Sequence, residues 1–131
     1  MSNNKWPSDY PTGIEVPPEG AVEVDANLFR LVTKTVPDAD DFLASYKDPK
    51  QRHLARNPKI QQKPGFYGTS FFDTHASIKE LVEGNPERFD GQLIAEGMVK
   101  PKHGKGEFSK HSNHVSVWLY DGVYPDGFKV V

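Results

Sequence analysis

The chain has 131 residues, 36% of them hydrophobic, and a formal net charge of −2. It contains no cysteine, which excludes disulfides, thiolate catalysis and cysteine-based zinc sites. No apolar run approaches the roughly 18 residues of a membrane span, and the first residues lack the apolar core of a signal peptide. We therefore expect a single domain over residues 1–131 that is cytoplasmic and does not contact a membrane.

The charge is unevenly distributed along the chain. Residues 1–46 contain eight acids against three basic residues, whereas segment 47–63 contains six basic residues against one acid. A second basic cluster lies in segment 100–114. Two such patches in a slightly acidic protein suit an acidic partner protein or a phosphate-bearing ligand. The alternative is that both segments are ordinary solvated surface.

The first third of the chain predicts an arm, a strand and short helices. Residues 1–21 are rich in Pro and Gly and predict an extended arm. Residues 28–35 alternate as a strand with Arg30 in its middle, and an Arg there needs either solvent or an anionic partner. The acids after Pro37 predict a helix start near residues 38–46, and a second, exposed helix is expected between Pro49 and Pro58.

The stretch from residue 65 to 84 is the most site-like part of the chain. A strand is expected from Phe66 to Phe72, and Asp73 or Thr74 then caps a helix with one apolar face. Gly84 is expected just past the end of that helix. A strand that runs directly into a helix start presents hydroxyls and free backbone N–H groups to a ligand.

The last third of the chain predicts strands. Residues 92–99 alternate weakly, 100–113 read as a basic loop, 114–120 form the clearest strand, and 128–131 predict a closing strand. In the clearest strand, Val115, Val117 and Leu119 share one face. We expect the apolar face of the 74–83 helix to cover them. The predicted fold is α+β, with a small, largely antiparallel twisted sheet of four to five strands and short helices.

This order of elements resembles the ADP-ribosyltransferase superfamily, including its RES-type toxin branch. The features that carry the resemblance are the Arg in the first strand (F-R-L) and the strand Y-G-T-S-F-F that runs into a helix. The resemblance implies that NAD is the substrate and that Arg30 holds its pyrophosphate or ribose. It also implies that Ser70 and Thr69 orient the nicotinamide ribose while Tyr67 or Phe71 stacks on the ring.

The resemblance covers roughly residues 28–100 and departs from the family at the catalytic carboxylate. Those transferases place a Glu late in the chain, often in an E-x-E or Q-x-E pair, but the C-terminal strand here is H-V-S-V-W-L-Y. Glu96 and Glu107 are the nearest substitutes, and we take them as the candidate catalytic residues. The implied function is that of a toxin or effector that cuts the nicotinamide–ribose bond of NAD.

A non-enzymatic interaction module is the main alternative. An inhibitor, immunity or adaptor protein would use exposed aromatic side chains and the two basic segments to bind an acidic protein or a nucleic-acid backbone. A remoter alternative is a two-histidine phosphoesterase, which the pair H-A-S-I and H-V-S-V resembles. In that pair His75 and Ser77 would match His114 and Ser116.

The histidines do not predict a metal site. One further group of possible ligands lies late in the chain, and its members are His103, Glu107, His111 and His114. His111 and His114 share a face only if the segment is helical, which the β-branched run that follows argues against. We therefore expect solvated, neutral imidazoles.

Overall fold

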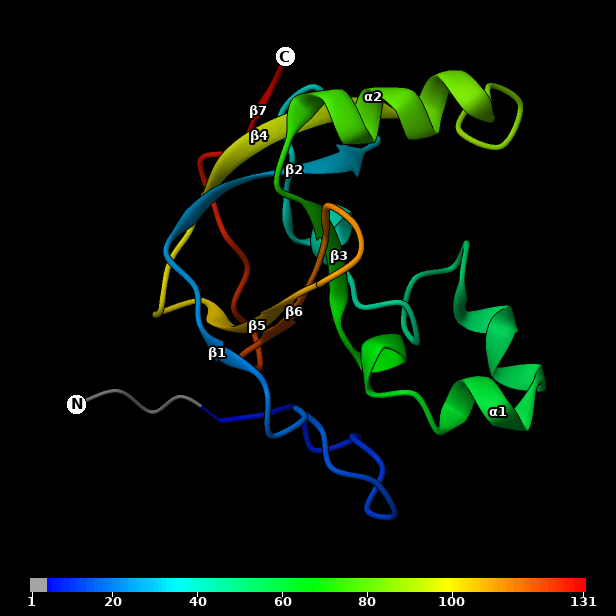
Figure 1. The fold of residues 1–131 in the computed structure, drawn as a ribbon, viewed down its shortest axis with the longest axis vertical. Coiled ribbons are helices and arrows are strands. Elements are labelled where there is room, and N and C mark those ends of the chain that lie inside the picture. Colours follow the sequence, from blue (N-terminus) through cyan, green and yellow to red (C-terminus); the bar gives the residue numbers. More distant parts are fainter. Residues whose placement is uncertain (1–4) are drawn as a thin grey trace.

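The computed structural model describes residues 5–131, which form an α+β fold around one antiparallel sheet (Figure 1). Seven strands pair in the order β1-β5-β6-β3-β2-β4-β7. The strands are β1 (Val22–Glu23), β2 (Ala26–Val32), β3 (Thr69–Phe72), β4 (Leu93–Val99), β5 (Gly104–Phe108), β6 (His114–Leu119) and β7 (Lys129–Val130). The α+β class and the antiparallel sheet are confirmed, whereas the expected count of four to five strands is wrong.

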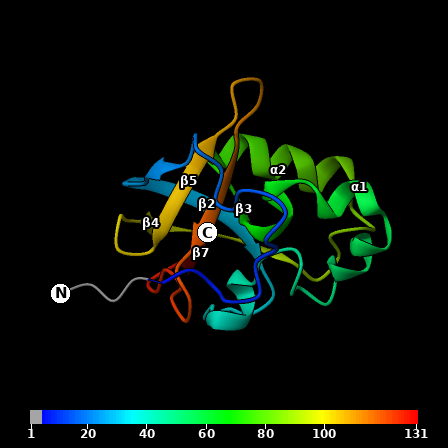
Figure 2. The ribbon, with the colours of Figure 1, turned by 90° about the horizontal axis from the view of Figure 1, so that it is seen from below.

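The helical segments are short. They are the 3-10 turns η1 (Ala39–Phe42), η2 (Arg52–Arg56) and η3 (Pro64–Tyr67) and the α-helices α1 (Pro58–Gln61) and α2 (His75–Gly84). Both α-helices lie on the right-hand side of the molecule in Figures 1 and 2. Among residues 5–131, no helix has the length and apolar character needed to cross a membrane.

Strand β5 lies inside the segment that the sequence predicted as a loop. Its sequence, G-K-G-E-F, lacks an apolar alternation, but it pairs with β6 along its whole length. A Cβ at Gly104 would overlap the carbonyl oxygen of Trp118, and one at Gly106 would lie 2.5 Å from Cγ2 of Val24. The two glycines are therefore what allows the backbones to approach this closely.

The helix boundaries differ from the prediction in detail. The helix expected over 38–46 is the single 3-10 turn η1, and the strand expected from Phe66 begins only at Thr69 because η3 precedes it. Thr74 caps α2, as expected, by accepting a hydrogen bond from the backbone N–H of Ser77 at 3.2 Å. Gly84 is the last residue of the helix rather than the residue after it, and Asn85 is the C-cap.

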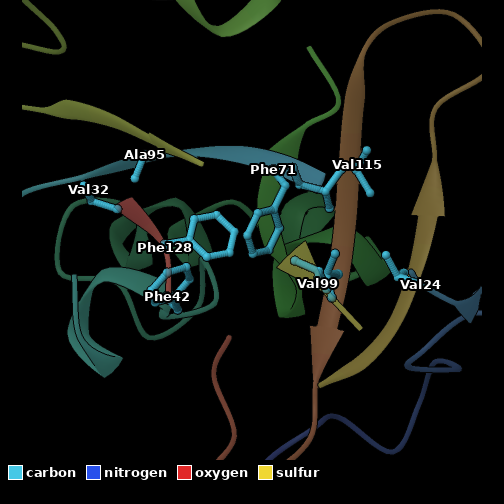
Figure 3. Packing of buried hydrophobic residues seen from close by; sticks show 10 residues of the cluster. Val24, Val32, Phe42, Phe71, Ala95, Val99, Val115 and Phe128 are labelled. Atoms are coloured by element: carbon cyan, nitrogen blue, oxygen red, sulfur yellow. The ribbon is translucent and has the colours of Figure 1, made fainter. Parts of the chain in front are cut away.

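The main core lies within the curve of the sheet. Val115 and Val117 are fully buried as predicted, while Leu119 is only partly buried. The expected cover by α2 is wrong, because the cluster that contains these valines does not include the buried Ile78 of α2. Side chains of β2, β3 and β4 and two aromatic rings fill the space instead (Figure 3); these residues are Leu28, Phe71, Ala95, Val99, Phe42 and Phe128.

A second, aromatic cluster holds the N-terminal arm. Trp118 is 1% exposed, and its indole N–H donates to the carbonyl oxygen of Pro64 at 3.0 Å. Trp118 packs with Phe66 and Tyr67, and the arm residues Trp6 and Tyr10 pack against this cluster. The arm contains turns and bends but no helix or strand between residues 5 and 21, and its aromatic side chains fix it to η3.

The close approach of β5 and β6 gives a stability prediction. We expect Gly104→Ala to lower the free energy of unfolding by about 1–3 kcal/mol, because the added methyl group forces the two backbones apart. Gly84→Ala is the matched control, since a Cβ there meets nothing within 4 Å. That variant should be equal to or more stable than the wild type by up to about 1 kcal/mol. Urea denaturation of both variants is the measurement, and equal midpoints would contradict the packing described here.

Candidate functional site

The sheet opens between β2 and β3. Strand β2 pairs with β4 along its whole length, and β3 pairs with β6 along its whole length. Strands β2 and β3, in contrast, pair at a single position, Phe29 with Phe72. Beyond that pair the two strands separate, and we call this opening the fork (Figure 1).

The side chain of Arg30 bridges the fork. Its Nε donates to the carbonyl oxygen of Asp41 at 2.7 Å, and its Nη1 donates to the carbonyl oxygen of Ser70 at 2.6 Å. Its Nη2 lies 3.5 Å from the carbonyl oxygen of Leu43. One guanidinium thus joins β2 to β3, to η1 and to the residue that follows η1, where a strand pair would otherwise supply backbone hydrogen bonds.

Arg30 is a buried cation without a counter-ion. The residue is 8% exposed, and within residues 5–131 no carboxylate oxygen comes close enough to pair with it as an ion. Burial lowers the pKa of Arg30 to about 10, against the opposing effect of the negative charges of Asp48 and Asp41. A guanidinium has five N–H donors, and the three carbonyl contacts use three of them. Charge and donor capacity therefore remain for an anionic ligand.

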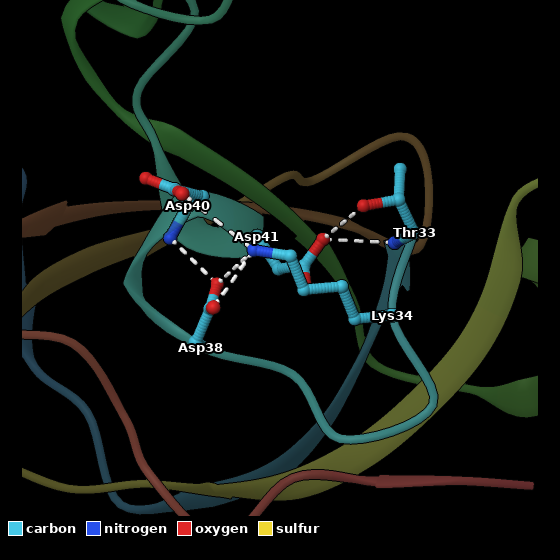
Figure 4. Close-up of polar contacts among 5 residues, drawn as sticks. All are labelled: Thr33, Lys34, Asp38, Asp40 and Asp41. Carbon is cyan, nitrogen blue, oxygen red and sulfur yellow. Dashed lines mark hydrogen bonds and ion pairs between the residues drawn. The ribbon is translucent and has the colours of Figure 1, made fainter.

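Asp41 fixes the segment that receives Arg30 (Figure 4). Its Oδ1 accepts hydrogen bonds from the backbone N–H of Thr33 at 2.8 Å and from the Thr33 hydroxyl at 2.9 Å. Its Oδ2 is buried and has no hydrogen-bond partner among the described residues. Lys34 reinforces the same turn by pairing with Asp38 at 2.7 Å and with Asp40 at 3.5 Å.

A cavity of about 750 Å³ lies at the fork, and we call it the fork cavity. Its floor includes Arg30 and Ser70, and its walls come from the segment before η2, from the end of α2 and from β6. The walls combine cations, carboxylates, aromatic rings and one imidazole: Lys50, Arg88, Asp40, Asp41, Asp48, Phe72, Phe89 and His114. A volume of this size falls in the range of ligand pockets of roughly 300–1,000 Å³.

The imidazole of His114 forms part of the wall on β6. Burial lowers the pKa of His114, which favours the neutral ring at physiological pH. This ring and the ring of Phe72 pack edge to face, with centroids 5.6 Å apart. His75 lies in the first turn of α2 and is not among the residues that line the cavity, so this cavity does not hold a pair of histidines.

The structure brings two of the five expected NAD-contacting residues together. Arg30 and Ser70 both line the fork cavity. Phe71 is fully buried in the core, and its ring points to the cluster around Phe42 rather than to a cavity. Tyr67 and Thr69 line a separate, smaller cavity, and the Thr69 hydroxyl donates to the carbonyl oxygen of Phe42 at 2.9 Å.

Neither candidate catalytic glutamate lines the fork cavity. Glu96 lies on β4 and accepts a hydrogen bond from Asn27 Nδ2 at 3.0 Å, while Glu107 lies exposed on β5. The carboxylates at the cavity are those of Asp40, Asp41 and Asp48. The sequence marks Asp40 and Asp41 only as acids at a helix start, and no local pattern indicates that they and Asp48 lie at the same cavity as Arg30.

His103 differs from the solvated imidazole that the sequence predicted. It is 5% exposed, and its Nδ1 accepts a hydrogen bond from the backbone N–H of Lys100 at 2.9 Å. Burial lowers the pKa of His103, and the neighbouring charge of Lys102 adds to this effect. The residue therefore stabilises the turn before β5. Within residues 5–131, no three His, Asp or Glu side chains are grouped so that they form a metal site.

The basic segments contribute little to the cavity. From segment 47–63 only Asp48, Pro49, Lys50 and Gln51 line it, and Arg52 and Arg56 lie exposed on η2. From segment 100–114 only His114 does so.

Comparisons with protein-family models, with curated proteins and with solved structures found no match for this chain. Its function is therefore argued from the geometry of the fork cavity.

The bridging role of Arg30 gives a second prediction. Arg30→Met leaves three carbonyl groups at the fork without their donor, and we expect a loss of about 2–4 kcal/mol in the free energy of unfolding. Arg88→Met removes an exposed arginine from the same cavity and should change stability by no more than about 0.5 kcal/mol. Chemical denaturation distinguishes the two variants, and an Arg30→Met protein as stable as the wild type would refute the bridge.

Proposed function

We propose that this protein is an ADP-ribosyltransferase-like domain that binds NAD in the fork cavity and cleaves its nicotinamide–ribose bond, as a toxin or effector would. The observation that carries the proposal is the buried guanidinium of Arg30, which lacks a counter-ion and lies beside Ser70 on the floor of a cavity of about 750 Å³. An anionic ligand compensates for the hydration that this cation loses on burial, because it forms charge-assisted hydrogen bonds with the guanidinium.

The charges of the cavity suit a pyrophosphate. Arg30 is preorganised by its carbonyl contacts, so that little side-chain entropy is lost when it binds a phosphate. Lys50 and Arg88 also line the cavity and are exposed, and they add positive charge to its wall. Three carboxylates line the cavity beside these three cations, and one of them, Asp40, is already paired with Lys34. The buried Arg30 has no counter-ion, so it is the group that suits a ligand with adjacent phosphates.

The apolar parts of the cavity suit the rings of the dinucleotide. Phe72 on β3 and Phe89 after α2 are both partly buried and line the cavity. These rings take the stacking role that the sequence assigned to Tyr67 or Phe71. Stacking on an aromatic side chain is worth roughly 1–3 kcal/mol per base, which complements the charge-assisted contacts of the phosphates.

Asp48 is the carboxylate best placed for the chemical step. Asp40 pairs with Lys34, and one oxygen of Asp41 is occupied by Thr33 while the other is buried. Asp48 lines the cavity, and among residues 5–131 its carboxylate accepts hydrogen bonds only from the backbone N–H of Lys50 and the side chain of Gln51. Its negative charge is thus available to stabilise positive charge on the ribose.

The reaction is a substitution at C1 of the nicotinamide ribose. The bond between this carbon and the pyridinium nitrogen breaks, and neutral nicotinamide leaves with the bonding electrons. The ribose carbon becomes positively charged in the transition state, which the carboxylate of Asp48 stabilises. Water or a nucleophile of an acceptor molecule then bonds to C1 and releases its proton to solvent. Arg30 and Ser70 hold the substrate in place during this step.

Binding and turnover are tested separately. Calorimetric titration with NAD should show binding by the wild type. Arg30→Lys should weaken NAD binding about ten- to a hundredfold, because the planar set of N–H donors of the guanidinium is lost. Arg52→Met is the matched control, because Arg52 is exposed on η2 outside the cavity. If folded wild-type protein gives no heat signal at millimolar NAD, the proposal is contradicted. A specific partner protein recovered by pull-down would then favour an interaction module.

Turnover is measured as nicotinamide release, with and without cell lysate as a source of acceptors. Asp48→Asn should reduce release far more than NAD affinity, because the lost charge acts in the transition state. Ser70→Ala should also lower turnover more than binding. Glu96→Gln and Glu107→Gln should leave both unchanged, because neither residue lines the cavity. Binding by the wild type without any release would refute the chemical step and leave a nucleotide-binding protein.

A further inference from the structure

All five tyrosines of the chain line one small cavity. The segment between η1 and η2 separates this cavity from the fork cavity. This cavity has a volume of about 190 Å³, and we call it the tyrosine pocket. It lies between the N-terminal arm, the segment after η1 and the turn after β6, and it shares only Leu43 with the fork cavity. The five side chains are Tyr10, Tyr46, Tyr67, Tyr120 and Tyr124.

Hydrogen bonds to protein acceptors use the hydroxyl protons of three of these tyrosines. Tyr46 donates to Asp9 Oδ1 at 2.6 Å, and Tyr67 donates to the carbonyl oxygen of Gln61 at 2.9 Å. Tyr10 donates a weaker bond to the carbonyl oxygen of Tyr67 at 3.4 Å. What these residues still offer a ligand is therefore hydroxyl lone pairs and electron-rich ring faces, which attract cations and not anions.

The charges near the tyrosine pocket are also negative on balance. The charged residues that line the pocket are Lys47 and Asp121. Lys47 is paired with Asp9, which lies outside the lining, at 3.3 Å, whereas Asp121 has no ion-pair partner within residues 5–131. Burial raises the pKa of Tyr10, and the charges of Asp9 and Asp121 raise it further. Lys47 already lies over the ring of Tyr46, with Nζ 5.4 Å from the centroid, which shows that a ring of this pocket accepts a cation.

We propose that the tyrosine pocket binds a small organic cation, such as the head group of a quaternary ammonium compound. The pocket is smaller than the roughly 300 Å³ at which sites for drug-sized ligands begin, so its occupant is a head group of a few heavy atoms. The tyrosine rings surround the methyl groups, and Asp121 supplies the opposite charge. This site is independent of NAD binding in the fork cavity.

The test compares choline with its uncharged carbon isostere 3,3-dimethylbutan-1-ol, in the full chain with isotope-labelled tyrosine. Choline should shift the ring resonances of the pocket tyrosines in a saturable way, and the alcohol should bind about tenfold more weakly because it lacks the charge. Equal affinities would overturn the proposal in favour of a plain apolar cavity. No shifts at about 50 mM choline, above the millimolar affinity typical of weak sites, would overturn it altogether.

Variants separate charge from shape. Asp121→Asn should weaken choline binding several-fold and leave the alcohol unchanged, whereas Asp126→Asn, an exposed acid outside the pocket, should change neither. Tyr120→Leu should weaken choline binding and Tyr120→Phe should restore it, because the ring face and not the hydroxyl makes the contact. If Asp121→Asn and Tyr120→Leu both bind choline like the wild type, the pocket is not the cation site.

Discussion

The contact between one guanidinium and three backbone carbonyls determines how this sheet is built. Strands β2 and β3 are neighbours in the sheet and yet pair at only one position, so their backbone groups beyond Phe29 need other partners. Arg30 supplies donors to β3, to η1 and to the residue that follows η1 at the same time. An aliphatic side chain at this position would fill the space but leave those carbonyls unpaired, which is why a charged residue is buried at the centre of the fold.

The same contact creates the conditions for a ligand site. A cation held by neutral carbonyls keeps its full charge, and burial makes that charge costly until an anion binds. The segment between η1 and η2 forms a wall of both the fork cavity and the tyrosine pocket. The unpaired charged groups in the two linings differ in sign, because Arg30 lines the fork cavity and Asp121 lines the tyrosine pocket. The two proposed ligands accordingly carry opposite charge at the groups recognised.

The sequence predicts the parts of this fold that depend on local patterns. Two local patterns predict site residues that line the same cavity. The Arg among the apolar residues of 28–35 indicates Arg30, and the T-S strand before a helix indicates Ser70. Strand β5 could not be predicted, because Gly104 and Gly106 are required by the neighbouring strands and give no alternation of their own. The cover over Val115 and the carboxylate of Asp48 were missed for a similar reason. Both depend on the curvature of the sheet and on the fork, which bring together residues far apart in the chain and cannot be predicted from a local sequence pattern.

We propose that Arg30 at the fork recognises a pyrophosphate. The most direct test is a crystal structure of the protein soaked with ADP-ribose, the part of NAD that remains after nicotinamide leaves. We expect density for the pyrophosphate in the fork cavity, with a phosphate oxygen within about 3 Å of a terminal nitrogen of Arg30, the usual length of such a charge-assisted bond. ADP-ribose bound elsewhere at full occupancy, with Arg30 contacting only its three carbonyls, would contradict it.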